Sequence, residues 1–280
     1  HMQVGDLMAF LQYSMMILFS LIMLSMIFVM LPRAAVSAAR IREVLELEGS
    51  IHDVSAPKQA GSGGLVEFRN VTFRYPGAEQ PALENISFEA KPGEVTAIIG
   101  GTGSGKSTLV NLIPRFYDVE SGRVLIDGVD VREMAQENLR KKIGFVPQKA
   151  VLFSGTIADN IRYGKADASD EEVRRAAETA QALEFIMQME GGFDAKVAQG
   201  GTNLSGGQKQ RLSFARALVR KPGIYVFDDS FSALDYKTDA KLRQALRQET
   251  GDAAVLIVAQ RVSTVVNADR IIVMENGRGA

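Results

Sequence analysis

The sequence predicts an α/β fold with a phosphate-binding core, preceded by one long apolar helix. Three observations support this prediction: an uncharged apolar run near the start, a glycine-rich loop between an apolar strand and a helix, and a second apolar strand that ends in two aspartates. The 280 residues can bury a substantial core, since one soluble unit usually takes about 150 to 220 residues. We therefore expect one large domain with appendages.

Composition excludes several kinds of site. The formal net charge is -1, so the chain has no overall basic field to hold the phosphates of a nucleic acid, and nucleic acid is not an expected partner. The chain has no cysteine, which excludes disulfides, thiolate metal sites and a cysteine nucleophile. We interpret residues 1–4, with His1 and Met2, as a cloning remnant and the start of a fragment, and His52 as a solvated residue. Any metal site must therefore use oxygen ligands.

The first predicted element is a membrane-spanning helix. Residues 7–31 carry no charge, and about 20 apolar residues suffice to cross the hydrocarbon core of a bilayer. A secretory signal would have a shorter apolar core, basic residues before it and a small-residue cleavage site after it. Asp6 precedes the run, whereas Arg33, Arg40 and Arg42 follow it. We expect the helix to lie in an inner or plasma membrane, and the positive-inside tendency places everything after Pro32 in the cytoplasm.

The helix is expected to continue beyond the membrane and then to give way to a linker. Strong helix formers with apolar residues at helical spacing follow the run, and Gly49 ends the pattern. Residues 50–64 are polar and rich in Gly, Ser and Pro, a composition that resists packing. We therefore divide the chain into a helical region over residues 5–49, a linker over 50–64 and a main domain over 65–280.

A glycine-rich loop follows the second predicted strand of the main domain. Strands are predicted over residues 65–76 and 86–100 from their β-branched and aromatic residues, and a helix is predicted over 107–116. The string between them fits G-x-x-x-x-G-K-[ST], the P-loop pattern, in the strand-to-helix context that the pattern requires. Its residues are Gly100, Gly101, Thr102, Gly103, Ser104, Gly105, Lys106, Ser107 and Thr108.

The chemistry expected of this loop is phosphate binding. Glycines let backbone amides converge on phosphate oxygens, and the following helix directs its positive end toward them. Lys106 is expected to bind the β- and γ-phosphates, and Ser107 to ligate Mg²⁺ through its hydroxyl, with Thr108 close behind. An ordinary glycine turn is the alternative, but the Lys-Ser pair between a strand and a helix argues against it.

A second apolar strand, residues 223–227, ends in Asp228 and Asp229. An acidic residue that emerges from such a strand in a P-loop enzyme holds Mg²⁺, and we assign that role to Asp228. A turn residue at the end of the strand is the alternative interpretation. The P-loop earlier in the chain favours the metal-binding one.

The motif Ser205, Gly206, Gly207 and Gln208, preceded by a leucine, lies between the two strands and opens a predicted helix. A P-loop, LSGGQ and a strand ending in DD, in that order, resemble the ABC ATPases, and the resemblance runs from about residue 65 to the end. It implies a P-loop NTPase (RecA-like) core with an antiparallel β subdomain and an inserted α-helical subdomain over about residues 149–220. It also implies ATP and Mg²⁺ as ligands.

The resemblance assigns further residues. Tyr75 matches the aromatic residue that stacks on adenine, Gln148 matches the glutamine that links Mg²⁺ to the transmembrane part, and Asp235 closes a loop at a dimer interface. By resemblance, two such domains face head to tail, and each ATP lies between one P-loop and the LSGGQ of the other subunit. Residues 5–45 are similar to the last transmembrane helix and cytoplasmic extension of an ABC exporter half, so we expect a fragment that lacks five earlier helices and the end of the domain.

Two departures from the family pattern affect the chemical step. Asp229 stands where members that hydrolyse ATP well carry glutamate, and Gln260 stands where the family has a histidine that contacts the γ-phosphate. A carboxylate displaced by about 1 Å can cost roughly 10²-fold in rate, and glutamine cannot take a proton near neutral pH. With Lys106, these are the expected catalytic residues. The pattern resembles the slow site of a heterodimeric exporter, in which the intact LSGGQ completes the site of a second half-transporter.

Two alternatives stay open at this stage. A homodimeric exporter could hydrolyse ATP at ordinary rates despite both departures, and a non-transport ABC protein could act as an ATP-gated interaction module. The uncharged run over residues 7–31 argues against the second. The expected partners of the apolar run are membrane lipid and the remaining transmembrane helices. The transported substrate is open among lipid, peptide and drug.

Overall fold

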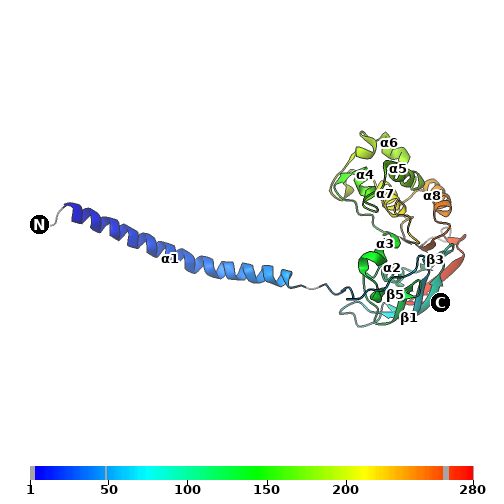
Figure 1. The fold of residues 1–280 in the computed structure, drawn as a ribbon, viewed down its shortest axis with the longest axis horizontal. Coiled ribbons are helices and arrows are strands. Elements are labelled where there is room, and N and C mark those ends of the chain that lie inside the picture. The colour runs from blue at the N-terminus through cyan, green and yellow to red at the C-terminus, as the bar shows by residue number, and fades with distance from the viewer. Residues whose placement is uncertain (1–3, 48, 261–264, 280) are drawn as a thin grey trace. The chain divides into compact units, whose positions relative to one another are not determined.

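The computed structural model describes residues 4–47, 49–260 and 265–279, which form two units split between His52 and Asp53. The predicted cloning remnant at His1 and Met2 lies outside the described residues. The first unit is helix α1 (Val4–Leu45), which has no buried residue (Figure 1). It is long and apolar enough to cross a membrane. The helix ends at Leu45, before the predicted end at Gly49, and it continues through Pro32, where one intrahelical hydrogen bond is missing.

Two larger sheets build the second unit. The antiparallel sheet has the order β2-β1-β4-β5, and the six-stranded sheet has the order β12-β11-β3-β10-β9-β6, in which only β12 runs antiparallel. The first comprises β1 (Val66–Phe73), β2 (Leu83–Ala90), β4 (Ser121–Ile126) and β5 (Val129–Asp130). The second comprises β3 (Val95–Gly100), β6 (Ile143–Val146), β9 (Ile224–Asp228), β10 (Ala254–Val258), β11 (Arg270–Glu275) and β12 (Arg278–Gly279). The predicted α/β core and antiparallel subdomain are confirmed.

The strand β9 shows how the six-stranded sheet is buried on both faces. All five of its residues are buried, as the continuous apolar run of a central parallel strand predicts. Side chains alternate along a strand, so Tyr225 and Phe227 enter the core under the helices, whereas Ile224 and Val226 enter the core shared with the antiparallel sheet. The sheet is thus the middle layer of the unit.

Helices follow the strands. Beside the sheets lie α2 (Lys106–Asn111), the 3₁₀ turn Val131–Glu133, α3 (Gln136–Lys141) and α8 (Tyr236–Glu249). Between β6 and β9 the chain forms α4 (Ile157–Arg162), α5 (Asp170–Thr179), α6 (Leu183–Gln188) and α7 (Gly206–Leu218), with a small ladder of β7 (Gly155–Thr156) and β8 (Lys196–Val197). We call α4 to α7 the helical part; these helices gather together in Figure 1, in green to yellow.

The stretch expected to be an unpacked linker is bound to the second unit from Asp53 onward. Residues 53–64 have no helix or strand, but Asp53 Oδ1 accepts a hydrogen bond from the backbone N–H of Gln136 at 2.9 Å. The backbone N–H of Lys58 donates to the carbonyl of Glu133 at 2.8 Å, and Lys58 Nζ lies 3.0 Å from Glu133 Oε1. The composition of this segment shows that it has few apolar residues to pack. It does not show that Asp53 and Lys58 form hydrogen bonds with the second unit.

The helix after the P-loop is shorter than predicted. It was expected over residues 107–116, whereas α2 ends at Asn111 and turns follow. Pro114 disfavours the α conformation in the residue before it. Arg115 then adopts a left-handed conformation with φ of 54°, which ends any continuation of the helix.

Candidate nucleotide-binding site

Five strands of the six-stranded sheet run parallel and end on the same side, and four neighbouring ones carry predicted site residues at their carboxyl ends. Parallel pairing orders them β3-β10-β9-β6, and the chain leaves their carboxyl ends at the P-loop, Gln260, Asp229 and Gln148 respectively. The carboxyl ends of parallel strands are where open α/β sheets bind ligands. We call this group, with Asp228, the nucleotide edge.

The P-loop is so tightly packed that two of its glycines leave no room for a side chain. At Gly100, where φ is 154°, a Cβ atom would lie 2.2 Å from the carbonyl oxygen of Met274. At Gly105, φ is 95° and a Cβ atom would lie 2.9 Å from the carbonyl oxygen of Ala82. Glycine is therefore required at both positions for the loop to keep its course between neighbouring backbone segments.

Lys106 is folded back over the loop. Its Nζ donates to the carbonyl oxygens of Gly100 at 2.9 Å and Gly101 at 2.5 Å, and to Ser104 Oγ at 3.2 Å. Only 7% of the residue is exposed. An ammonium has three donors, and the loop supplies an acceptor for each, so the positive charge is fixed inside the loop.

Ser107 and Asp228 are brought together across the sheet, although they lie far apart in the sequence. Ser107 Oγ donates to Asp228 Oδ1 at 2.9 Å. Burial raises the pKa of the Asp228 carboxyl, and the neighbouring Asp229 adds to this, whereas the Ser107 hydrogen bond and Lys106 act in the opposite direction. A buried carboxylate beside a hydroxyl suits a hard cation.

These groups fit a Mg²⁺ site in which the protein supplies only a few of the ligands. Mg²⁺ usually binds one or two carboxylates and completes its shell with water and substrate phosphates. In the described residues no three acidic or histidine side chains cluster into a closed metal site. Ser107 and Asp228 could hold the ion next to the P-loop, and Gln148 adds an amide oxygen at the same edge.

The carboxylate of Asp229 is the meeting point of two amide side chains. Gln260 Nε2 donates to its Oδ2 at 2.8 Å, and Gln148 Nε2 donates to the same oxygen at 3.2 Å. Asp229 is 8% exposed and has a positive φ of 43°, a backbone conformation uncommon for a residue with a side chain. The two residues expected to affect the chemical step are thus in direct contact.

Tyr75 lies next to the helix that follows the P-loop. Its hydroxyl is 3.0 Å from Thr108 Oγ1, and its ring packs edge-on against Phe73, with centroids 4.8 Å apart. The aromatic residue assigned to adenine is therefore in contact with the phosphate-binding element.

The LSGGQ motif begins α7 in the helical part. Ser205 caps the helix by accepting from the backbone N–H of Gln208, and the Gln208 side chain accepts from the backbone N–H of Ser205 at 2.8 Å, which completes a capping box. Gly206 and Gly207 form the first turn, and a Cβ atom at Gly207 would lie 3.3 Å from the carbonyl oxygen of Ala233. The motif thus belongs to a different element from the P-loop.

Asp235 begins α8. Its side chain accepts from the backbone N–H of Thr238 at 3.0 Å, and hydrogen bonds to Thr238 lower the pKa of the Asp235 carboxyl. The residue predicted for the dimer interface is thus a helix N-cap at the surface.

With this geometry in place, comparison with known proteins identifies the family. A family model described as ABC transporter matches residues 83–232, which is more than half of the chain. The chain belongs to the ABC transporter family. The matched segment contains the P-loop, the LSGGQ motif, and Asp228 and Asp229 at the end of β9, and ATP-binding domains of this family are ATPases.

Among ABC transporters, two curated relatives are similar over most of this chain. An uncharacterized ABC transporter ATP-binding protein of Mycobacterium tuberculosis is 51% identical over 282 residues, which cover 99% of this chain and 48% of the relative. The beta-(1→2)glucan export ATP-binding/permease protein NdvA of Bradyrhizobium diazoefficiens is 47% identical over 245 residues, 86% of this chain and 40% of the relative. The chain therefore spans about half the length of the curated relatives it matches.

A solved structure supports the same family. A bacterial Atm1-family ABC exporter with ATP bound matches with a TM-score of 0.89 and 37% identity, covering 99% of this chain and 49% of that one. This similarity is to an exporter of the family, the type that the motifs and the apolar helix predict.

The sequence did not reveal a group of residues that contact Tyr75 and hold the loop after α2. Tyr117 contacts the ring of Tyr75, and Arg115 pairs with Asp118 on either side of it. The sequence could have shown only that two aromatic residues stand between an arginine and an aspartate. The left-handed backbone at Arg115, which directs them, has no glycine to signal it.

Proposed function

We propose that this chain is the ATP-binding subunit of an ABC exporter and that it drives substrate export by ATP binding and hydrolysis in a head-to-tail dimer. The match to an Atm1-family exporter and the name of the glucan export relative support export as the direction of transport. The chain covers about half of these proteins, so the other transmembrane helices are expected to be partners of α1.

In this proposal α1 crosses the membrane and contacts lipid. Its length and apolar composition support this, and the arginines that follow residue 31 favour a cytoplasmic location for the second unit. ATP binds from the cytoplasm at the nucleotide edge.

The binding half of the proposed site consists of the P-loop, Ser107 and Asp228, with Tyr75 stacking on adenine. Lys106 would exchange its bonds to the loop carbonyls for phosphate oxygens, a change that strengthens each bond because both partners are charged. Bound Mg²⁺ supplies positive charge between the phosphates. Ser107, Asp228 and Gln148 would hold that ion.

The chemical half consists of Asp229 and Gln260, and we propose that it makes this site slow. A general base must accept a proton from the attacking water, yet Asp229 Oδ2 already accepts hydrogen bonds from two amides. A carboxylate oxygen has two lone pairs, and the two amide donors occupy those of Oδ2, so this oxygen is not open to the proton of an attacking water. The two amide contacts on Asp229 are the observation on which the slow site rests.

Slow hydrolysis in this site is compatible with transport if a second subunit hydrolyses ATP. The LSGGQ motif is intact and its capping box is formed, so it could complete the site of a partner that retains glutamate and histidine. We therefore favour a heterodimer of two half-transporters. A homodimer with two ordinary sites is the alternative.

The test compares ATP turnover and MgATP binding of the chain with those of the double variant Asp229→Glu, Gln260→His. We expect turnover to rise by about 10²-fold with binding unchanged, because the missing chemical groups are restored and the binding half is untouched. A matched control makes the same two exchanges at exposed positions, Asp252→Glu with Gln248→His, and should leave turnover unchanged.

Each outcome has a distinct meaning. Equal, measurable turnover in the chain and in the double variant would show that Asp229 and Gln260 do not slow hydrolysis. The homodimer with two ordinary sites would then be favoured. Failure of both to bind MgATP would overturn the assignment of the nucleotide edge itself.

A further inference from the structure

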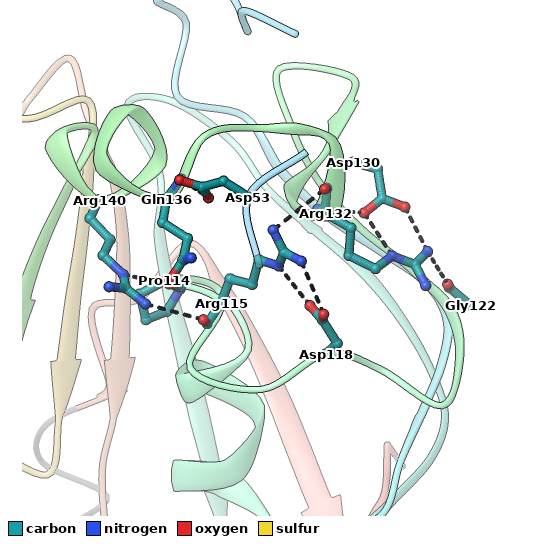
Figure 2. A network of polar contacts seen from close by, with 9 residues as sticks. All are labelled: Asp53, Pro114, Arg115, Asp118, Gly122, Asp130, Arg132, Gln136 and Arg140. Carbon is teal, nitrogen blue, oxygen red and sulfur yellow. Dashed lines mark hydrogen bonds and ion pairs between the residues drawn. The ribbon is translucent and has the colours of Figure 1, made fainter. Parts of the chain in front are cut away.

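The loop after α2, residues 114–118, is held in one conformation by a buried arginine. Arg115 is 4% exposed, and its guanidinium donates to both carboxylate oxygens of Asp118, at 2.7 and 3.0 Å. A third donation goes to the carbonyl oxygen of Arg132 at 3.4 Å (Figure 2). The planar guanidinium and the carboxylate therefore close the loop as a two-point clamp.

A second arginine holds the same loop from α3. Arg140 donates to the carbonyl oxygens of Pro114 at 3.2 Å and Arg115 at 3.4 Å, and its guanidinium lies 5.6 Å from the ring centre of Phe116. Figure 2 shows the Arg140 side chain directed at the backbone of Pro114 and Arg115, whereas the Arg115 side chain is directed at Asp118. The left-handed conformation of Arg115 is unfavourable for a residue with a side chain. The loop keeps this conformation because several charged groups fix it.

What this loop supports is the aromatic residue assigned to adenine. Tyr117 meets the ring of Tyr75 edge-on, with centroids 5.2 Å apart and planes at 85°. Phe73 contacts both rings, at 4.8 Å from Tyr75 and 5.4 Å from Tyr117. The hydroxyl of Tyr75 is held by Thr108. The ring of Tyr75 is therefore contacted by two aromatic rings, and its hydroxyl lies within hydrogen-bond distance of Thr108 Oγ1.

We propose that Tyr117 is a positioning residue for the nucleotide: it fixes the ring plane of Tyr75 for stacking on adenine, and the Arg115–Asp118 ion pair fixes Tyr117. This inference rests on the proposed function, in which Tyr75 stacks on the base. A ring that is already oriented loses less conformational freedom when the ligand binds, and the saving appears as affinity. Tyr117 needs no contact with the nucleotide to contribute in this way.

A purely structural role for Tyr117 predicts a different result from a positioning role. Damage to the fold near the P-loop would weaken every ligand of the loop, whereas loss of the ring orientation weakens only ligands that carry a base. Inorganic tripolyphosphate with Mg²⁺ has the phosphates and lacks the base. The ratio of its affinity to that of MgATP therefore separates the two roles.

The experiment measures both affinities by calorimetry on the whole chain in detergent. For Tyr117→Leu we expect MgATP affinity to fall by about 2- to 10-fold, the range given by the strength of an edge-to-face aromatic pair, with tripolyphosphate affinity unchanged. Tyr117→Phe keeps the ring and should restore MgATP affinity. Tyr163→Leu, at an exposed tyrosine of the helical part, is the matched control and should change neither affinity.

Two further variants make the result decisive. Asp118→Asn weakens the clamp without removing any aromatic ring, and it should lower MgATP affinity in the same selective way but by less, which tests the inference even if Tyr117→Leu does not fold. Tyr75→Leu should lower MgATP affinity by about tenfold or more.

The outcomes distinguish the inference from the proposal beneath it. An unchanged MgATP affinity in Tyr117→Leu and Asp118→Asn, or an equal loss for both ligands, overturns the positioning role while the Tyr75 result leaves the nucleotide site standing. An unchanged MgATP affinity in Tyr75→Leu removes the base-stacking assignment, and the role of Tyr117 falls with it.

Discussion

Two carboxylates, Asp228 at the nucleotide edge and Glu172 in the helical part, are affected by their surroundings in opposite ways. In the helical part, Ser169 and Glu172 form a capping box, and the carboxylate of Glu172 also binds Lys165 Nζ at 2.6 Å. These contacts lower the pKa of Glu172 to about 2, with the hydrogen bond from Lys165 as the largest cause. At the nucleotide edge, burial raises the pKa of Asp228. The surroundings therefore stabilise the ionised form of Glu172 and destabilise the ionised form of Asp228.

The difference indicates which region is built for binding. Charges that are poorly compensated in the free protein are compensated when a ligand of opposite charge arrives, and sites of this kind reduce stability in exchange for function. Among the described residues, the Oγ of Ser230, directly after Asp229, is also buried without a hydrogen-bond partner. In the helical part, Glu172 finds its hydrogen-bond partners in Ser169 and Lys165 and needs no ligand to compensate its charge.

The largest expected effect comes from removing the charge fixed inside the P-loop. Lys106→Ala should lower MgATP affinity by about 10- to 100-fold, since a hydrogen bond to a charged group contributes roughly 1.5–3 kcal/mol. Titration calorimetry measures the loss. Lys91→Ala, at an exposed turn lysine, is the control. If Lys106→Ala and Lys91→Ala bound MgATP equally well, Lys106 would not contribute to nucleotide binding. The proposed difference between the nucleotide edge and the helical part would then be wrong.

A second variant tests the cost of the buried carboxylate. A raised carboxyl pKa means that the folded state favours the protonated form, so folding is favoured while Asp228 is protonated and loses that contribution as pH rises through its folded pKa. At neutral pH the ionised group is therefore a penalty. Asp228→Asn removes it and should raise the thermal midpoint of the free protein by about 2–4 °C, while Mg²⁺-dependent ATP binding falls.

The control for this measurement is Asp252→Asn, at an exposed turn. A lower midpoint in Asp228→Asn, with MgATP binding preserved, would mean that Asp228 stabilises the fold and does not serve the ligand. The two regions would then no longer differ in the way described.

The comparison also explains what the sequence could predict. The P-loop, the strands β3 and β9 and the helix α7 were predictable because each is encoded by neighbouring residues: an apolar run, a glycine pattern or a capping box. The contact between Gln260 and Asp229 joins residues from two strand ends, and only the pairing of β10 with β9 brings them together. The Arg115 clamp depends on a backbone conformation that no local pattern announces. The attachment of the segment from Asp53 onward depends on a distant partner, Gln136, which composition cannot show. The early end of α2 has a local cause, since Pro114 and the left-handed Arg115 follow it.

The smallest expected effect lies in the helical part and has the opposite sign. Because the folded pKa of Glu172 is lowered from 4.5 to about 2, its contribution to stability is fully present above about pH 4.5 and is lost as the pH falls from there toward 2. Glu172→Gln should therefore lower the thermal midpoint slightly at pH 6, and the difference from the unmodified chain should shrink at pH 3. The change should be modest, since the pair with Lys165 is partly exposed and screened by salt. Glu171→Gln, on the neighbouring exposed residue, controls for the loss of a negative charge at the start of α5. MgATP affinity should be unchanged in both variants. A pH-independent difference would show that Glu172 acts through the cap geometry alone, because glutamine and glutamate both accept from a backbone N–H and only the ionised carboxylate responds to pH.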